Sequence, residues 1–292
     1  MLSVCREWKT RILAMLTAHL GRLLELQAAG KYNRDNAAPQ GLCLLECQAL
    51  DIYVINLDRS KDRLLAFEKL NGHLKPNVLR FSAREGKNVA RGPLVDRGII
   101  TADLGYGDGA LGNALSHLAL WDLAIEKNQS LTVCEDDAIF NRGFGPAAES
   151  LIKALPRDWH VIFWGWNFDS IVLFDIIPGV SPCLGFFDQD RMRMGIDAFQ
   201  SARLMPQPFR LFRMFGTVGY SISPMGAQAM KQHCLPLRNM DVFIPGLERA
   251  VPNRALDIML NDVYPRVNAY VSFPPLVITR NFHSISTVQP AL

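Results

Sequence analysis

The run Leu131-Thr132-Val133-Cys134-Glu135-Asp136-Asp137-Ala138-Ile139-Phe140 decides how this chain is interpreted, because it sets three consecutive acids after a short apolar stretch. The β-branched residues and the polar flank before them predict a buried strand over residues 131–134. Because side chains alternate along a strand, Glu135 and Asp137 are expected on one side and Asp136 on the other. Two carboxylates on one side favour a divalent cation, which prefers carboxylate oxygens. The alternative is a solvated acidic turn without a function.

The composition is that of an ordinary globular protein. The chain has 292 residues, 49% of them hydrophobic and 20% charged, enough for one large domain or two small ones. A net charge of +3, without a run of Lys or Arg, argues against nucleic acid as a partner. The cysteines are scattered, and Cys43 and Cys47 lack a second pair at zinc-like spacing. A reduced, cytoplasmic protein is therefore expected.

The first 48 residues are predicted to form a separate segment, an amphipathic helix followed by a linker. Apolar residues recur at helical spacing over residues 12–26, but basic residues interrupt them, so neither a secretory signal nor a membrane span is expected. Residues 31–41 are polar and rich in helix breakers, as is typical of a linker. The helix is expected either to pack on protein or to lie on an anionic membrane. Residues 49–292 are predicted to form one domain.

Strand and helix patterns alternate through this domain. The alternation predicts an α/β fold, with helices flanking a largely parallel sheet. Strands are expected at residues 51–57, 78–82, 131–134, 161–164 and 218–223, and helices at residues 59–70, 114–126 and 225–232. Residues 169–215 have weak periodicity and many Pro, Gly, Met and Phe residues, so we expect a long irregular insertion that forms a lid or a substrate-binding wall.

A glycine pattern offers a rival interpretation. Gly107, Gly109 and Gly112 match G-x-G-x-x-G just before the helix predicted at residues 114–126. In a dinucleotide-binding fold such a loop holds the pyrophosphate, and an acid about 20 residues further on binds the ribose. The chain would then be an NAD- or FAD-dependent oxidoreductase. The fingerprint needs a strand before its first glycine, however, and the residues before Gly107 make a poor one. A flexible loop at a helix start is the third interpretation.

Six short pieces of the sequence stand in an order that a known family shares. They are Val54-Ile55-Asn56-Leu57-Asp58-Arg59 with Arg63, Arg80-Phe81-Ser82-Ala83, Gly112-Asn113-Ala114-Leu115-Ser116-His117 with Trp121, Glu135-Asp136-Asp137-Ala138, Gly216-Thr217-Val218-Gly219-Tyr220-Ser221-Ile222-Ser223 with Gly226-Ala227, and Pro274-Pro275-Leu276-Val277. In this order they resemble glycosyltransferase family 25, which includes lipopolysaccharide galactosyl- and glucosyltransferases and collagen galactosyltransferases. Cys134 departs from the usual Leu, and residues 169–215 are longer than the family leads us to expect.

The resemblance implies a GT-A fold, an inverting mechanism, and transfer of galactose or glucose from a UDP-sugar to a glycan acceptor. It also implies a divalent metal, usually manganese (Mn²⁺), which would neutralise charge on the diphosphate leaving group. Asp137 is then a metal ligand, and Glu135 reaches the ribose, the metal or its bound water. Such enzymes often recruit a late histidine as a further ligand, which singles out His283. A surface histidine on a tail is the alternative.

The resemblance also implies a donor site. Asn56, Arg59 and Arg63 follow the first predicted strand, and open α/β sheets place nucleotides at the carboxyl ends of their strands. An ordinary helix start with solvated arginines is the alternative, above all for Arg63. Ser116 and His117 become candidates for substrate binding through the resemblance alone, since a histidine inside a helix is more often structural.

The acceptor needs a base, typically a carboxylate, that takes the proton of the attacking hydroxyl. Asp241 and Asp257 follow the strand predicted at residues 218–223. Asp257 lies in the apolar run 256–261, where a lone carboxylate needs a reason, whereas Asp241 follows Arg238 and would pair with it. We expect Asp257 to be the base, with a helix residue facing water as the alternative.

The acceptor implied by the resemblance is a lipid-linked oligosaccharide at the inner face of the cytoplasmic membrane. The basic N-terminal helix would hold the enzyme there peripherally, since each basic residue near an anionic surface contributes about 1 kcal/mol. Packing of this helix against protein remains the other expectation.

Overall fold

The computed structural model describes residues 50–74, 77–245 and 247–281, all of which belong to the structural unit Gln48–Leu292. The predicted N-terminal helix and linker, the boundary between residues 48 and 49, and His283 lie outside these ranges and stay predictions. Among the described residues, no helix combines the length and the apolar character needed to cross a membrane.

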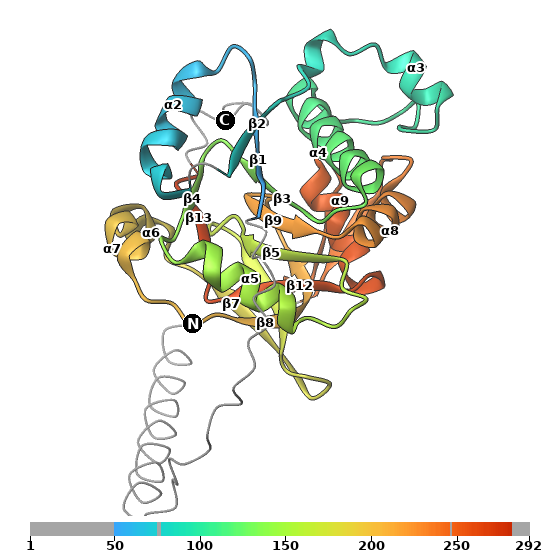
Figure 1. The fold of residues 1–292 in the computed structure, drawn as a ribbon. Coiled ribbons are helices and arrows are strands. Elements are labelled where there is room, and N and C mark those ends of the chain that lie inside the picture. The colour runs from blue at the N-terminus through green and yellow to red at the C-terminus, as the bar shows by residue number, and fades with distance from the viewer. Residues whose placement is uncertain (1–49, 75–76, 246, 282–292) are drawn as a thin grey trace, which may run out of the picture. The chain divides into compact units, whose positions relative to one another are not determined.

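A mixed sheet forms the centre of the described unit (Figure 1). Over the described ranges it has nine strands, in the order β2-β1-β3-β9-β5-β12-β8-β6-β7. Their bounds are β1 Ile52–Asn56, β2 Val78–Ser82, β3 Leu131–Glu135, β5 Val161–Gly165, β6 Ile171–Ile177, β7 Ser181–Phe186, β8 Gln207–Met214, β9 Gly219–Ile222 and β12 Ala269–Phe273. The pairs β2–β1, β1–β3 and β5–β12 are parallel, whereas every other pair is antiparallel. The prediction of a largely parallel sheet was wrong, because β9 runs against both of its neighbours and β6 runs against both β7 and β8.

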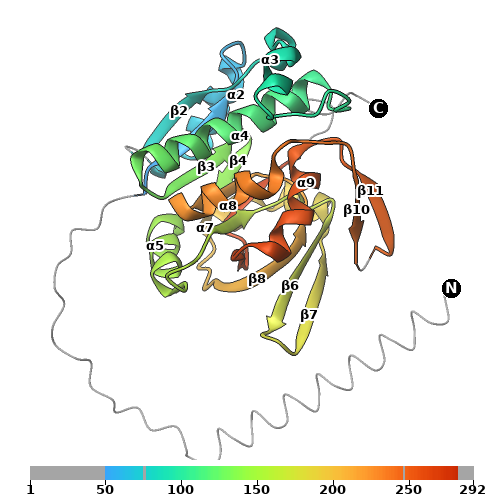
Figure 2. The same ribbon diagram turned by 90° about the vertical axis from the view of Figure 1, so that its right-hand side faces the viewer.

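Helices cover both faces of this sheet, which confirms the α/β class (Figure 1, Figure 2). Their bounds are α2 Lys61–Leu70, α3 Arg91–Asp96, α4 Asp108–Lys127, α5 Phe144–Ala154, α6 Gln189–Met194, α7 Ile196–Ser201, α8 Pro224–Cys234 and α9 Leu256–Val263. Helices α4, α8 and α9 bury apolar side chains in one core, and α2 and α5 bury theirs in a second. Along β1, Tyr53 and Ile55 enter the first core, and Ile52 and Val54 the second. A strand covered on both faces must be apolar throughout, as β1 is.

Most of the predicted elements are confirmed, but residues 169–215 are not the irregular insertion that we expected. They contain β6, β7 and β8 as well as α6 and α7. The glycines that suggested irregular structure end these elements instead. Gly179, with φ of 71°, lies in the turn between β6 and β7, and Gly195 separates α6 from α7.

The three acids lie where the chain passes from one sheet to another. β3 ends at Glu135, residues 136 and 137 form the turn, and β4 (Ala138–Phe140) pairs with β13 (Val277–Thr279) outside the main sheet. The alternation of side chains along β3 therefore stops at Glu135. It no longer predicts that Asp137 and Glu135 point to the same side of the sheet. A further small sheet pairs β10 (Asp241–Ile244) with β11 (Arg249–Pro252).

Candidate functional site

A cleft opens where the carboxyl ends of β1 and β2 meet the first turns of α4. Its lining consists of Ile55, Leu57, Arg59, Arg63, residues 83–87, Asp108, Gly109, Asn113, Glu135 and Asp136. A second pocket is lined by Arg63, Ala66, Phe67, Leu70, residues 136–139, Arg280 and Asn281. Arg63 and Asp136 line both, whereas Glu135 lines the first and Asp137 the second. The acidic turn therefore stands between the two hollows.

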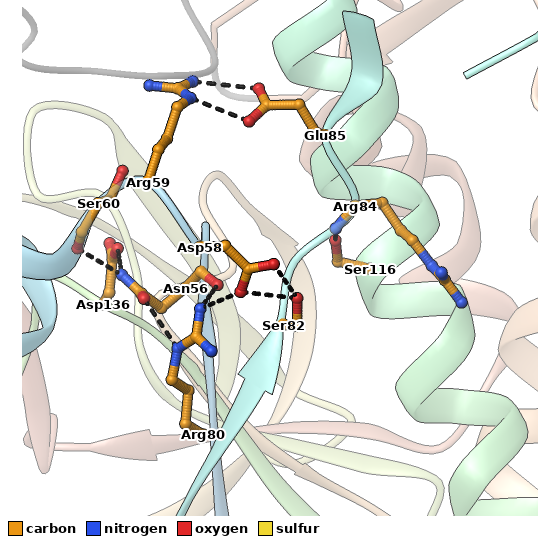
Figure 3. A network of polar contacts seen from close by, with 10 residues as sticks. All are labelled: Asn56, Asp58, Arg59, Ser60, Arg80, Ser82, Arg84, Glu85, Ser116 and Asp136. Carbon is orange, nitrogen blue, oxygen red and sulfur yellow. Dashed lines mark hydrogen bonds and ion pairs between the residues drawn. The ribbon is translucent and has the colours of Figure 1, made fainter. Parts of the chain in front are cut away.

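Asp136 is the most firmly held of the acids, although sequence patterns gave it no role. Asn56 Nδ2 donates to Asp136 Oδ2 at 2.7 Å (Figure 3), and Arg63 Nε donates to Oδ1 at 2.8 Å. Asn56 is 2% exposed, and it also donates to the backbone oxygen of Ser60 and accepts from Arg80 Nε at 3.1 Å. Asn56 and Arg63, which were predicted to bind the donor, thus make contacts that fix the acidic turn.

Two ion pairs join residues of β1, β2 and the loops that follow these strands (Figure 3). Arg59 donates to both carboxylate oxygens of Glu85, at 2.9 and 3.2 Å, and this pairing lowers the pKa of Glu85. Arg80 pairs with Asp58, which also accepts a hydrogen bond from the hydroxyl of Ser82 at 2.9 Å. Arg59 therefore lies at the cleft, where a bound anion would have to compete with Glu85 for its guanidinium.

Glu135 is held through a single carboxylate oxygen. Thr217 Oγ1 donates to Glu135 Oε1 at 2.6 Å, and Asn113 Nδ2 approaches the same oxygen at 3.5 Å. His117 Nε2 lies 3.7 Å from it. Burial by itself raises the pKa of Glu135, but the interactions with His117, Thr217 and Asn113 outweigh burial and lower it. The side chain is therefore an ionised acceptor at neutral pH.

Ser116 and His117 lie beneath the cleft and are wholly buried. Ser116 Oγ donates to the backbone oxygen of Gly112 at 2.7 Å and accepts from the backbone N–H of Arg84 at 2.8 Å. This pair of bonds fastens the loop after β2 to α4. Neither side chain lines the cleft. His117 could therefore influence a substrate in the cleft only through Glu135.

Asp137 is the least satisfied of the acids. Its Oδ1 is buried and accepts no hydrogen bond, although the side chain as a whole is 36% exposed. Burial and the charge of Glu135 raise the pKa of Asp137 to about 7, against the opposing effect of Arg63, whose Nη2 lies 3.8 Å away. An unpartnered carboxylate oxygen fits a hard cation. Among the described residues, however, no group of three or more His, Cys, Asp or Glu side chains could hold a metal by itself.

The two candidate bases occupy different places. Asp257, in the first turn of α9, accepts the backbone N–H of Gly216 at 2.9 Å, while the adjacent Thr217 binds Glu135. Burial raises the pKa of Asp257. Asp241 is exposed on β10, beside a pocket formed with Gly105, Asn239, Met240 and residues 252–254. Adjacent residues of one loop thus connect Asp257 with Glu135.

The glycines at residues 107–112 serve helix packing. Gly107 precedes α4 as its N-cap, and residues 101–107 form no strand. A Cβ on Gly112 would overlap the backbone oxygen of Arg84, so this position lets the loop after β2 approach the helix. Gly109 lines the cleft, but the strand that a dinucleotide fingerprint requires is missing. Nothing observed supports the oxidoreductase interpretation.

A family model and a known protein each match part of this chain. The model of the family described as "Glycosyltransferase family 25 (LPS biosynthesis protein)" matches residues 49–244, which include the cleft and the acidic turn. An Anopheles gambiae protein described as a glycosyltransferase 25 family member is 31% identical over 126 residues. The matched stretch covers 39% of this chain, but the chain spans only 21% of that relative's length. The chain belongs to glycosyltransferase family 25.

Proposed function

We propose that this chain is a glycosyltransferase that moves galactose or glucose from a UDP-sugar to a glycan acceptor, with inversion at the anomeric carbon and with a bound divalent cation such as Mn²⁺. The observation that carries the proposal is the unpartnered carboxylate oxygen of Asp137, next to a cleft at the carboxyl ends of β1 and β2. Nucleotides bind at such strand ends in open α/β sheets, and the layers described here are compatible with a GT-A fold.

The cleft suits the nucleotide part of the donor. It joins the ends of two parallel strands to the N-terminus of α4, whose unpaired backbone N–H groups favour phosphate. Glu135 offers an ionised acceptor fixed at the cleft wall, which is suited to a ribose hydroxyl. The nucleoside diphosphate would therefore lie along the cleft.

We propose that Asp137 holds the metal and that the neighbouring carboxylate of Glu135 is a second candidate ligand. His283, outside the described ranges, remains a candidate ligand. Cations that work with phosphates are commonly bound by one or two carboxylates together with the substrate's own oxygens, so a cage of three protein ligands is not required. When bound, the metal would neutralise charge on the departing diphosphate.

Asp257 is the residue that we propose as the acceptor's base. In a single displacement the acceptor oxygen attacks the anomeric carbon, the bond to UDP breaks, and the base takes the hydroxyl proton. A raised pKa makes Asp257 a stronger proton acceptor than an ordinary aspartate, and Gly216 and Thr217 connect it to the donor cleft. Asp241 is the alternative, and it lacks such a connection among the contacts that the structure describes.

The acceptor is proposed from the family description, which mentions lipopolysaccharide biosynthesis. A lipid-linked oligosaccharide would be met at the cytoplasmic face of the membrane, in lipopolysaccharide or another surface polysaccharide pathway. Peripheral contact through the N-terminal helix is part of the same proposal.

A donor screen tests this proposal. The purified protein is incubated with UDP-galactose, UDP-glucose and other nucleotide sugars, with Mn²⁺ or with EDTA, and release of the nucleoside diphosphate is measured. We expect slow hydrolysis of one of the two named donors in Mn²⁺ only. Once an acceptor is found, NMR of the product gives the anomeric configuration. Retention of configuration, activity in EDTA or the absence of UDP-sugar turnover would each reject a stated part of the proposal.

A further inference from the structure

A buried chain of polar side chains lies behind Glu135. Trp121 Nε1 donates to Tyr220 Oη at 2.9 Å, and Tyr220 Oη lies 2.9 Å from His117 Nδ1. The three side chains are at most 2% exposed. His117 Nε2, on the far side of the ring, faces Glu135 Oε1 at 3.7 Å, beyond hydrogen-bonding distance. The chain therefore runs from the core between α4 and β9 to the wall of the cleft.

The donors and acceptors in this chain fix the position of each proton. Trp121 Nε1–H can only donate, so Tyr220 Oη accepts from it and keeps its own proton for His117 Nδ1. Burial raises the pKa of Tyr220, which keeps the phenol protonated. With Nδ1 acting as acceptor, the proton of the neutral imidazole is on Nε2. The opposite tautomer would set a lone pair against the Glu135 carboxylate and leave the Tyr220 hydroxyl proton without an acceptor.

The two carboxylate oxygens of Glu135 differ in their contacts. The groups on Thr217, Asn113 and His117 all face Oε1. No described residue donates to Oε2, and Glu135 lines the cleft. One oxygen is thus tied to the core while the other is left for a ligand.

We propose that Tyr220 and Trp121 are positioning residues that hold His117 as the Nε2–H tautomer, and that His117 in turn presents Glu135 Oε2 to the donor in the cleft. The ligand contact rests on the proposed function, whereas the tautomer does not. His117 and Tyr220 act through Glu135 and touch no substrate themselves. The ligand class that this arrangement serves is a hydroxyl donor, such as a ribose hydroxyl of a nucleoside diphosphate.

The tautomer is measured first, in ligand-free protein. Long-range ¹H–¹⁵N spectra of ¹⁵N-histidine-labelled enzyme distinguish a protonated ring nitrogen from an unprotonated one, and His117→Gln identifies the His117 signals. We expect protonated Nε2 and unprotonated Nδ1 in the wild type, and loss of this preference in Tyr220→Phe. Tyr106→Phe is the matched control, because Tyr106 is a buried tyrosine whose hydroxyl instead donates to Asn253 Oδ1 at 2.8 Å.

The consequence for the donor is measured second, as the Kd of UDP and the donor KM. The side-chain N–H group of Gln can lie near the position of His117 Nε2, whereas that of Asn lies near the position of Nδ1. His117→Gln should therefore bind the sugar donor better than His117→Asn. We expect Tyr220→Phe and His117→Asn to weaken UDP binding on the order of 10-fold, the size of one lost hydrogen bond, with little change in kcat.

Each result has a defined meaning. A wild-type His117 protonated on Nδ1, an unchanged tautomer in Tyr220→Phe, or equal UDP binding by the Gln and Asn variants would overturn the positioning role. Failure of the wild type to bind UDP would instead reject the proposed donor, because the tautomer is measured without ligand.

Discussion

The two ends of the central sheet are built differently. At one end β2, β1 and β3 run parallel, and their carboxyl ends collect the cleft, the acidic turn and the bonded network around Asn56. At the other end β8, β6 and β7 run antiparallel and finish in a hairpin whose turn residue Val180 is 76% exposed. Parallel strands bring their carboxyl ends to one edge, so polar side chains can gather there. Antiparallel neighbours end at opposite edges of the sheet, so their carboxyl ends do not gather at one place.

The largest expected effect is at the acidic turn. Asp137→Asn should abolish transfer and donor hydrolysis, because a neutral amide cannot balance a cation, while the thermal midpoint stays close to that of the wild type. Asp175→Asn is the matched control at the opposite end of the sheet, where Asp175 Oδ2 accepts the backbone N–H of Gly179. Wild-type turnover by Asp137→Asn at saturating Mn²⁺ would remove the functional difference between the two ends.

The next largest effect is expected at Asp257. Asp257→Asn should lower kcat on the order of 10²-fold with donor KM little changed, as for a lost general base. Because a base works when deprotonated, and burial raises the pKa of Asp257, kcat of the wild type should fall with decreasing pH at a higher pH than an ordinary aspartate would give. Asp241→Asn is the paired measurement, and if it alone shows the loss of kcat, the two aspartates exchange roles.

A stability effect is expected at Gly112. Gly112→Ala should lower the free energy of unfolding by about 1–3 kcal/mol, because the added methyl group overlaps the backbone oxygen of Arg84 and the loop after β2 must shift. Gly107→Ala is the control, since nothing lies within contact of a Cβ at that position. Urea denaturation of both variants measures the difference. Equal stability would mean that the loop does not depend on its close approach to α4.

The smallest effect is expected at the hairpin. Val180→Ser should change the free energy of unfolding by less than about 0.5 kcal/mol, as for other exposed substitutions, and leave donor hydrolysis unchanged. Activity toward a glycan acceptor is the more informative measurement, since residues 169–215 were expected to form a lid or a substrate-binding wall. A marked rise in the KM for the acceptor in Val180→Ser would assign the hairpin to the acceptor side of the reaction.

The sequence predicted the parallel end of the sheet better than the antiparallel end, for a physical reason. β1, β3 and α4 carry continuous apolar patterns because they are buried on both faces or along one stripe, and such patterns can be recognised locally. β7 is half exposed and borders only β6, so its residues give little periodicity.

Sequence patterns pointed to residues around the cleft but not to the contacts between them. Asn56, Arg63, Glu135 and Asp137 were all singled out, yet the bond from Asn56 to Asp136 joins residues 80 positions apart, and no local pattern marks it. Tyr220 was noticed only as part of a resemblance. Its function as a link between Trp121 and His117 depends on the pairing of β3 with β9, which sequence spacing does not reveal.

The pairing of β4 with β13 has a consequence for the synthesis of this enzyme. The chain leaves the main sheet at the acids, and its next strand is completed by Val277–Thr279, with Thr279 opposite Ala138. A nascent chain that has emerged only as far as β12 already contains every acid of the turn but lacks the strand that β4 pairs with. We therefore expect the acidic turn to reach its final arrangement only after Val277–Thr279 has been synthesised and has paired with β4.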